Sequence, residues 1–253
     1  MSGTERAAQT KALLLAAGLG TRLRPLTDAV PKCLVDIAGR PLLDYWFEAL
    51  SEAGIREVLV NTHHLPEQVR RFIAGKNLQG FRAIETFEAQ LLGSAGTIAA
   101  NALWADDADD VVIIYSDNLS DVNVADLLAT HRRYGDPITM LLFHAPNPKA
   151  CGIAELDGEG RVIAFEEKPA TPKSDLANGG LYAITAAAWR EIAGMQAFDM
   201  GFDVLPRFTG RMRGHIHGGY HRDIGDLDSL DAARQTAPRV FDHDKRKQRG
   251  ARK

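Results

Sequence analysis

The stretch LLLAAGLGTRLRPLTDAVPKCL, residues 13–34, begins like a buried strand, turns at once into small residues and ends in a basic loop. In open α/β sheets, ligands bind at the carboxyl ends of the parallel strands, so the loop after a first strand is a favoured ligand site. Gly18 and Gly20 let backbone N–H groups approach a ligand without interference from Cβ atoms, and a run of such groups forms a nest for anions. Arg22 adds a guanidinium that matches phosphate oxygens, and Lys32 adds a point charge. The loop therefore predicts a polyphosphate site.

Two well-known phosphate loops do not fit this stretch. The Walker A loop requires Lys and then Ser or Thr after its last glycine, whereas Thr21 and Arg22 follow Gly20. The dinucleotide fingerprint requires a third glycine and an immediate helix, but position 23 is leucine, and the turn at Pro25 is expected to delay any helix until about Pro41. The stretch is thus a phosphate loop of another kind, or a glycine-rich connector with incidental basic residues.

Composition places the chain among ordinary globular proteins. It has 253 residues, of which 45% are hydrophobic and 25% charged, and its formal net charge of −3 does not indicate a nucleic-acid or membrane partner. No apolar run approaches the roughly 18 residues of a membrane span. The two cysteines, Cys33 and Cys151, form no CxxC motif, so reduced thiols and a cytoplasmic location are expected. The basic C-terminal run KRKQRGARK is interpreted as a solvated tail rather than a nucleic-acid arm.

Hydrophobic periodicity alternates strands with helices, which is typical of an α/β fold. The strands predicted for the first half span 12–16, 57–62, 81–87, 110–117 and 137–143. The helices predicted there span 41–53, 66–74, 94–103 and 122–134, with Gly54 after the first of them and Ser94 as a candidate N-cap. The second half predicts a hairpin around 157–160, a strand over 178–185, a helix over 199–208, short strands over 213–224 and a final helix over 226–235. We expect one domain over residues 11–238, with disordered tails over 1–10 and 239–253.

The longer string AAGLGTRLRPLTDAVPKCLVDIAGRPLLDY, residues 16–45, resembles the N-terminal signature of the sugar-nucleotide pyrophosphorylases. These nucleotidyltransferases join a nucleoside triphosphate to a sugar 1-phosphate. The resemblance continues through further motifs to about Asp226, and the string LGSAG is most similar to the mannose-1-phosphate and heptose-1-phosphate guanylyltransferases. It implies a Rossmann-like GT-A type fold, with a central, mostly parallel sheet flanked by helices. It also implies Mg²⁺ as cofactor and the release of pyrophosphate.

Carried over position by position, the resemblance implies a nucleotide site in the opening loop and in the later segment EAQLLGSAGT. The nucleotide-binding residues so implied are Ala16, Ala17, Gly18, Gly20, Thr21, Glu88, Gly93, Ser94 and Gly96. Arg22 would contact the triphosphate and Lys32 the phosphates. A Glu88 carboxylate can accept hydrogen bonds from N1 and N2 of guanine. The alternative for Glu88 is a surface carboxylate at the end of a strand.

The resemblance also implies two metal ligands that lie far apart in the sequence. In YSDN, Asp117 follows an apolar strand, although Ser116 replaces the usual glycine of the family. In HRDIGD, Asp223 supplies the second carboxylate, which Mg²⁺ needs when it is held between phosphates. Asp226 is better interpreted as the N-cap of the final helix.

The sugar side is implied by three shorter motifs. CGIAEL keeps the family glycine as Gly152, with Cys151 in the place of an aromatic residue. FEEKP implies that Glu167 binds sugar hydroxyls and that Lys168 binds the sugar phosphate; the alternative is a charged hairpin edge. NGGLY implies sugar contacts from Asn178 and Gly179. The implied sugar-binding part spans about 146–225, and the nucleotide-binding part about 11–145.

The predicted reaction is an in-line displacement at the α-phosphorus of the triphosphate, with Arg22, Lys32 and Lys168 as catalytic residues. A phosphate monoester already carries about −1.5 to −2 charges near pH 7, so it needs no general base. GTP with a mannose or heptose 1-phosphate is favoured, and a uridylyltransferase acting on another sugar 1-phosphate is the alternative. A non-catalytic nucleotide-binding homologue would be expected to lose the loop arginine or a metal carboxylate. A homo-oligomer is compatible with the sequence.

The histidines at 215, 217 and 221 alternate near the second carboxylate motif. Alternation on a strand directs side chains to one face, which could indicate a zinc site, but no cysteine or second histidine cluster joins them. We therefore expect these three side chains to face solvent.

Overall fold

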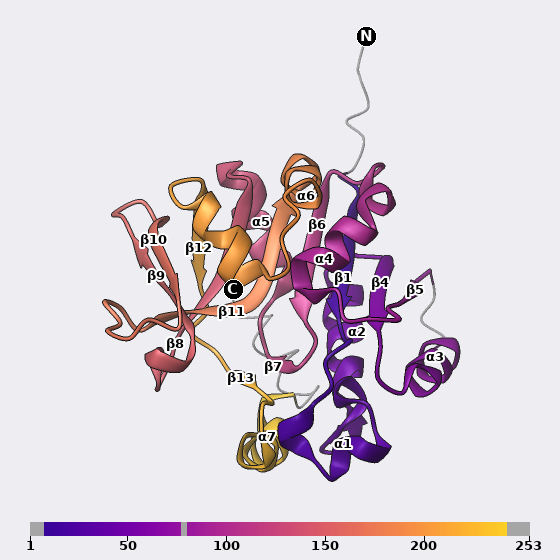
Figure 1. The fold of residues 1–253 in the computed structure, drawn as a ribbon. Helices are drawn as coiled ribbons and strands as arrows, with labels where there is room; N and C mark the ends of the chain where they lie inside the picture. Colours follow the sequence, from indigo (N-terminus) through magenta and orange to yellow (C-terminus); the bar gives the residue numbers. More distant parts are fainter. Residues whose placement is uncertain (1–7, 77–79, 242–253) are drawn as a thin grey trace.

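The computed structural model describes residues 8–76 and 80–241, and its spine is a nine-stranded sheet (Figure 1). The strands of this sheet are β1 (Thr10–Leu15), β4 (Glu57–Thr62), β5 (Arg82–Phe87), β6 (Asp110–Tyr115), β8 (Ile138–His144), β9 (Gly152–Leu156), β10 (Arg161–Glu167), β11 (Leu176–Thr185) and β12 (Met212–Ile216). Their order across the sheet is β5-β4-β1-β6-β11-β8-β12-β10-β9. Two small sheets pair β2 (Asp36–Ile37) with β3 (Arg40–Pro41), and β7 (Asn118–Ser120) with β13 (His221–Asp223).

The relative direction of neighbouring strands changes at β11. Strands β5, β4, β1 and β6 are parallel neighbours, whereas β11 runs antiparallel to both β6 and β8. Beyond it, β12 is parallel to β8, and β10 is antiparallel to β12 and β9. The predicted α/β class is confirmed, and the sheet is mixed. In the parallel part the register places Leu15, the last residue of β1, beside Asn61 and Tyr115. The loops that follow β1, β4 and β6 therefore leave the same edge of the sheet.

Helices cover both faces of the sheet. The α-helices are α1 (Leu26–Ala29), α2 (Leu42–Glu52), α3 (Pro66–Ala74), α4 (Gly93–Ala100), α5 (Val124–Tyr134), α6 (Ala186–Ala193) and α7 (Leu227–Val240). Tighter 3-10 turns are η1 (Thr21–Leu23), η2 (Lys32–Leu34), η3 (Ala102–Ala105), η4 (Pro148–Ala150) and η6 (Leu205–Phe208), and η5 (Met200–Val204) is a π-helical turn. Within the described ranges, every helix is too short or too polar to cross a bilayer.

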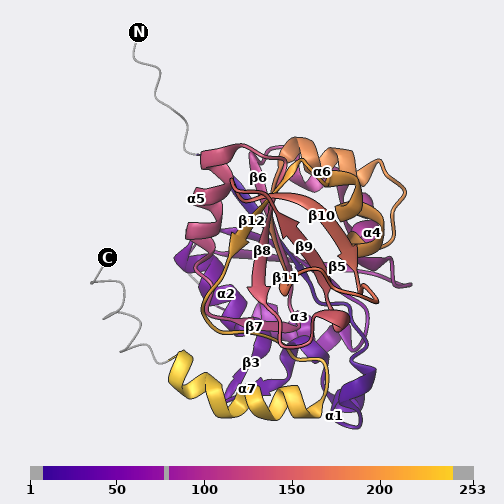
Figure 2. The same cartoon turned by 90° about the vertical axis from the view of Figure 1, so that its left-hand side faces the viewer.

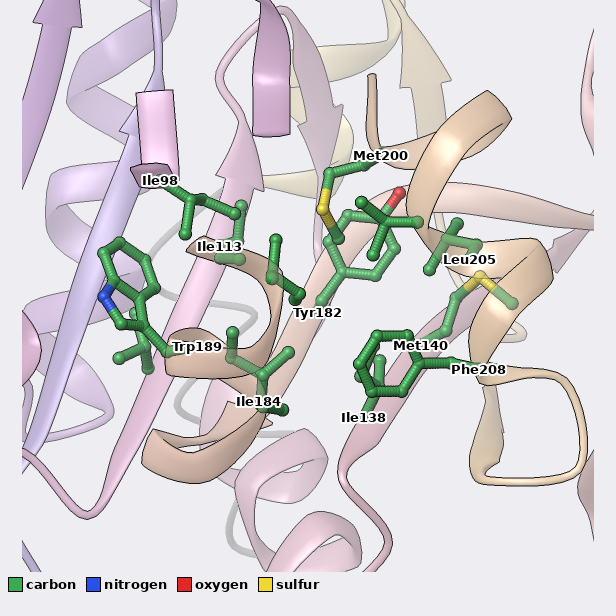
Figure 3. Packing of buried hydrophobic residues seen from close by; sticks show 14 of the residues in the cluster. Ile98, Ile113, Ile138, Met140, Tyr182, Ile184, Trp189, Met200, Leu205 and Phe208 are labelled. Atoms are coloured by element: carbon green, nitrogen blue, oxygen red, sulfur yellow. The ribbon is translucent and has the colours of Figure 1, made fainter. Parts of the chain in front are cut away.

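Helices lie against both faces of the sheet (Figure 2), and two hydrophobic cores fill the space between sheet and helices. On one face α2, α3 and α5 contribute a core around Trp46 and Phe47. On the other face α4 and α6 pack around Tyr182 and Trp189. Figure 3 shows Met200 and the segment after it closing over Tyr182. Burial of such large side chains stabilises the sheet by roughly 2 kcal/mol each.

A third, smaller core joins the two ends of the described chain. Helix α7 lies along the β2–β3 hairpin (Figure 2), and Leu23 and Ile37 are buried with Leu230. The rings of Tyr45 and Phe241 meet edge to face, with centroids 4.8 Å apart. This core brings the segment before α7 close to the opening loop of the chain.

Several element boundaries differ from the sequence prediction. Ser94 is not an N-cap, because α4 begins at Gly93 and no side chain caps it. The opening loop already contains the helical turns η1, α1 and η2 before α2, because proline directs chain reversals there without preventing single turns. The predicted helix over 199–208 consists of the π turn and a 3-10 turn. Helix α6 was not predicted, because its eight residues give only about two turns of helical periodicity. Thr185 caps it by accepting from the N–H of Ala188.

The limits of the folded part are slightly wider than predicted. Strand β1 begins at Thr10 and α7 continues to Val240, beyond the expected limits of 11–238. The remainder of the two predicted tails, residues 1–7 and 242–253, lies outside the described residues.

Asp226 caps α7, as the sequence indicated. Its carboxylate accepts from the N–H of Ser229 at 2.8 Å, and its own N–H donates to the Ser229 hydroxyl at 3.0 Å, which together form a capping box.

Replacing Asp226 with alanine should lower the free energy of unfolding by about 1 kcal/mol near neutral pH. The hydrogen bonds from Ser229, its backbone N–H first, lower the pKa of Asp226 below the ordinary 3.8. The contribution is therefore present above about pH 3.8 and is lost as the pH falls through the lower folded-state pKa. Urea denaturation of both proteins across this range measures the difference. Asp231→Ala, which removes an exposed ion pair with Arg234, is the control and should cost less than about 0.5 kcal/mol. Equal losses in the two variants near pH 7 would contradict the assignment.

Candidate active site

A cavity of about 320 Å³ opens where the parallel strands end. Its walls come from the loops after β1, β5 and β6, from the end of β4, from the turn η2, from the start of α4 and from the segment before η5. The residues that line it are Leu15, Ala16, Ala17, Gly18, Lys32, Cys33, Asn61, Glu88, Leu91, Gly93, Ser94, Tyr115, Ser116, Asp117, Phe198 and Asp199. The cavity thus contains eight residues of the predicted nucleotide, catalytic and metal sets, and they come from distant parts of the chain.

The two glycines of the opening loop have different structural roles. Gly20 adopts a left-handed conformation, with φ of +63°, and a Cβ there would lie 2.8 Å from the Thr27 side chain. The hydroxyl of Thr27 also donates to the Gly20 carbonyl at 2.7 Å, which fixes the turn. At Gly18, in contrast, a Cβ would meet no atom within 4 Å. Only Gly18 therefore leaves open space toward the cavity, and Thr21 is exposed beyond the turn.

Asn61, at the end of β4, holds the start of the opening loop. Its side-chain oxygen accepts from the N–H groups of Ala16 and Ala17, at 2.5 and 3.2 Å. The predicted anion nest is therefore smaller than the sequence suggested, because these two donors are already used inside the protein. Sequence reasoning missed Asn61, whose only local signal is a polar residue in a buried strand.

Glu88 is the buried partner of Asn61, with only 4% of its surface exposed. One carboxylate oxygen accepts from the Asn61 amide at 2.8 Å and from the Thr97 hydroxyl at 2.5 Å, and the other accepts from the N–H of Leu92 at 3.1 Å. The surface-carboxylate alternative for Glu88 is therefore wrong. Glu88 ties the opening loop to the start of α4, and its contact with a base stays a prediction.

The two glycines at the start of α4 allow close packing against the segment before η5. A Cβ at Gly93 would collide with the backbone and ring of Phe198, and Gly93 adopts a φ of +75°. At Gly96 a Cβ would lie 3.2 Å from the Leu92 side chain. These contacts explain both glycines structurally, and Ser94 between them faces the cavity.

The two distant carboxylates are brought together around Lys32. The Lys32 ammonium lies 2.6 Å from Asp117 and 3.9 Å from Asp223, and the residue is only 8% exposed. Pairing of β13 with β7 places Asp223 opposite Asn118, and the N–H of Ile224 donates to the Asp117 carbonyl at 2.9 Å. The predicted juxtaposition of residues 117 and 223 is therefore present.

Arg22 extends this charged centre. Its guanidinium lies about 3.1 Å from the position that a Cβ on Gly225 would take, close to Asp223. Among the described residues it forms no hydrogen bond or ion pair, so its donors are available. Burial and the charge of Asp117 raise the pKa of Asp223, while Lys32 and Arg22 oppose that rise.

The residues present fit a divalent cation. Mg²⁺ prefers oxygen ligands and is commonly held by one or two carboxylates together with substrate phosphates and water. Asp117 and Asp223 provide two carboxylates that share the single ammonium of Lys32. No group of three potential metal-binding side chains occurs in residues 8–76 and 80–241, so the protein alone offers an incomplete ligand set.

On the predicted sugar side, Glu167 is a half-buried carboxylate without a hydrogen bond or ion pair to any described residue. Its side chain occupies a space that exists because Gly152 and Gly201 have no Cβ. Burial raises its pKa, Lys168 lowers it, and Asp199 raises it further. Such a carboxylate is an available acceptor.

Lys168 adopts a left-handed conformation with φ of +51°, which is costly for a residue with a side chain. Its N–H donates to the Cys151 carbonyl at 3.0 Å, and its ammonium lies 5.9 Å from the centre of the Phe202 ring. Glu167 is the last residue of β10 and the exposed Lys168 follows it, so both side chains start from the end of this strand.

Asn178 and Gly179 are less available than predicted. The Asn178 amide donates to the Tyr182 hydroxyl at 2.8 Å, and its oxygen accepts from the N–H of Gly180 at 3.0 Å. Gly179 packs against Leu141, and its carbonyl accepts from the Asn118 amide at 3.3 Å. Both residues shape a bulge in β11, and their sugar contacts stay predictions.

The three histidines do not face solvent as expected. His215 shares a hydrogen bond with Thr130 at 3.0 Å, and His217 lies 2.9 Å from Asp121. The ring of His221 packs on Phe143, and burial lowers its pKa to about 4. His215 lies on β12 and His221 on β13, so the three do not alternate along one strand. Their burial was not predictable, because the residues that they contact lie far away in the sequence.

Comparisons with known proteins identify a matching family and several relatives. The family model described as nucleotidyl transferase matches residues 11–239. A glucose-1-phosphate thymidylyltransferase of Streptomyces antibioticus is 39% identical over 178 residues, covering 70% of this chain and 50% of the relative. The catalytic subunit beta of mannose-1-phosphate guanylyltransferase from Danio rerio is 34% identical over 241 residues, covering 90% and 67%. The chain thus spans about half to two thirds of these relatives.

A solved structure has the same fold. It is that of a Bacillus anthracis protein assigned as a glucose-1-phosphate thymidylyltransferase, with a TM-score of 0.80 and 22% sequence identity. The alignment covers 90% of this chain and 95% of the other.

Replacing Asn61 with leucine keeps the side-chain size but removes every hydrogen bond of the amide. The N–H groups of Ala16 and Ala17 and one oxygen of Glu88 would then lose a buried partner, and we expect a loss of about 2–4 kcal/mol in the free energy of unfolding. Urea denaturation measures it. Gln90→Leu, at an exposed site two residues after Glu88, is the matched control and should change stability by less than about 0.5 kcal/mol. A similarly small loss in Asn61→Leu would show that the network contributes little.

Proposed function

This chain belongs to the nucleotidyl transferase family, and we propose that it transfers a nucleoside monophosphate from a nucleoside triphosphate to a sugar 1-phosphate, releasing pyrophosphate. The observation that carries the proposal is the charged centre: the Lys32 ammonium between Asp117 and Asp223, with the unpaired Arg22 guanidinium beside it. This centre borders a cavity that begins at the glycine loop. Two phosphorylated substrates repel each other, so the cations Lys32 and Arg22, together with a divalent cation on the two carboxylates, would assist their approach.

The proposed transfer requires mainly the positioning of the two substrates and the neutralisation of their negative charge. Since the sugar phosphate is already anionic near pH 7, no residue is needed to remove a proton from it. Lys168 would orient that phosphate, while Arg22 and the open side of Gly18 would hold the departing pyrophosphate. Asp117 and Asp223 would hold Mg²⁺, which supplies further positive charge next to the phosphates when bound.

GTP is the favoured nucleotide. Guanine presents two neighbouring donors, N1–H and N2–H, and the buried Glu88 carboxylate borders the cavity with about one acceptor site left beyond its three internal hydrogen bonds, so it would accept from one of them. The guanylyltransferase relative that covers 90% of this chain also supports this choice. A uridylyltransferase is the alternative, since uracil needs one acceptor for its N3–H.

A hexose 1-phosphate such as mannose 1-phosphate, or a heptose 1-phosphate, is the favoured second substrate. The unpaired carboxylate of Glu167 is an acceptor for sugar hydroxyls, and Lys168 adjoins it at the end of β10. The rival function, a non-catalytic nucleotide-binding protein, is disfavoured because Arg22, Asp117 and Asp223 are all present and close together.

Arg22→Ala and Asp117→Ala should each lower turnover by at least about a hundredfold, because each removes a preorganised charge worth a few kcal/mol of transition-state stabilisation. Release of pyrophosphate from GTP and mannose 1-phosphate provides the assay. Arg24→Ala is the matched control, because Arg24 lies in the same loop but pairs with Asp28 at the surface; its turnover should stay within about threefold of the parent. Near-normal turnover in either test variant would remove that residue from the mechanism.

Turnover with ATP, CTP, GTP and UTP, each at equal concentration with the same sugar 1-phosphate, tests the base. We expect the highest kcat/KM with GTP, and we expect Glu88→Gln to reduce the preference for GTP over UTP by about tenfold or more, because an amide offers one acceptor fewer to guanine. A higher kcat/KM with UTP in the parent protein would favour the uridylyltransferase alternative.

A further inference from the structure

Two carboxylates from different parts of the chain lie against one backbone position. A Cβ on Gly201 would be 2.7 Å from a Glu167 oxygen and 3.2 Å from an Asp199 oxygen. Glu167 comes from the end of β10, and Asp199 directly precedes η5. The two acids therefore face each other across a glycine that is too small to separate them.

Asp199 is held firmly in this position. One of its oxygens accepts from the N–H of Phe202 at 3.0 Å, and the other accepts from the Ser94 hydroxyl at 3.2 Å. The N–H of Asp199 in turn donates to Asp203 at 2.8 Å. Because Ser94 and Asp199 both line the nucleotide cavity, the acid pair is located between that cavity and the sugar-side residues.

The positive charge near the pair is limited to one side. Lys168 is the cation that lowers the pKa of Glu167, whereas burial and Asp199 raise it. Lys32 and Arg22 lie instead at the charged centre around Asp223. The end of the sugar that points away from its phosphate would therefore meet negative charge.

We propose that Glu167 and Asp199 form an acidic sugar subsite that accepts uncharged sugar 1-phosphates and rejects those whose ring carries a carboxylate, such as hexuronic acid 1-phosphates. The inference rests on the proposed function and specifies its substrate class. Hydroxyl groups donate hydrogen bonds to both carboxylates, which satisfies them. A third carboxylate in this half-buried space is repelled by both, and the nearby cation, Lys168, would already be engaged by Glu167 and the sugar phosphate.

The test compares a neutral hexose 1-phosphate with the matching hexuronic acid 1-phosphate, for instance mannose and mannuronic acid 1-phosphate, by pyrophosphate release with each nucleotide. The parent protein should prefer the neutral sugar in kcat/KM by at least about a hundredfold. Asp199→Asn keeps an oxygen for the Phe202 N–H but removes the charge, and it should reduce this preference by about tenfold. Glu167→Gln should reduce the preference similarly, even if it lowers turnover with both sugars.

Glu166→Gln is the matched control. Glu166 neighbours Glu167 on the same strand but is exposed on the opposite face, so its removal should leave the preference unchanged. Comparable kcat/KM for neutral and acidic sugars in the parent, or an unchanged preference in both test variants, would overturn the acidic subsite while leaving the transferase function intact. No turnover with any nucleotide and neutral sugar 1-phosphate would instead overturn the proposed function.

Discussion

The ion pair between Lys32 and Asp117 is the interaction on which the site depends. A buried ammonium is stable only when it is paired, and two neighbouring carboxylates are stable only when positive charge compensates them. Lys32 meets both requirements at once, because its ammonium lies 2.6 Å from Asp117 and 3.9 Å from Asp223. The pKa of Asp223 is nevertheless raised. Because two carboxylates share one ammonium, a divalent cation that binds both would find negative charge to neutralise while Lys32 stays in place.

The fold makes this centre by bringing three chain segments to one sheet edge. Asp117 follows β6, Lys32 lies in the turn η2, and Asp223 arrives on β13, which pairs only with the short β7. Such a short ladder cannot position a carboxylate by itself. Its position is secured by α7, which is capped by Asp226 and packed against the β2–β3 hairpin. Stability at the periphery thus maintains the geometry at the centre.

The sequence predicted those structural features that have a local residue pattern or a family motif. The α/β class and the resemblance to sugar-nucleotide pyrophosphorylases are confirmed, and strand β4 and helix α3 have their predicted limits. Asn61 was missed, because its partners lie 45 residues before it and 27 after it in the chain. For the same reason burial of Glu88 was not predictable. Asp199 lay inside an expected helix, and only the packing of η5 directs its side chain to the cavity.

The segment around Asp199 makes the two halves of the cavity interdependent. Its carboxylate accepts from Ser94 on the nucleotide side and lies beside Glu167 on the sugar side. If a ligand group binds the Ser94 hydroxyl, the Asp199 oxygen loses that hydrogen bond and carries more negative charge. This charge then acts on any group that binds near Glu167. Linkage requires the reverse effect to be equally large for binding free energies. Under the proposed function, selectivity for the sugar and affinity for the nucleotide would both depend on the Asp199 carboxylate, and a change there would alter both.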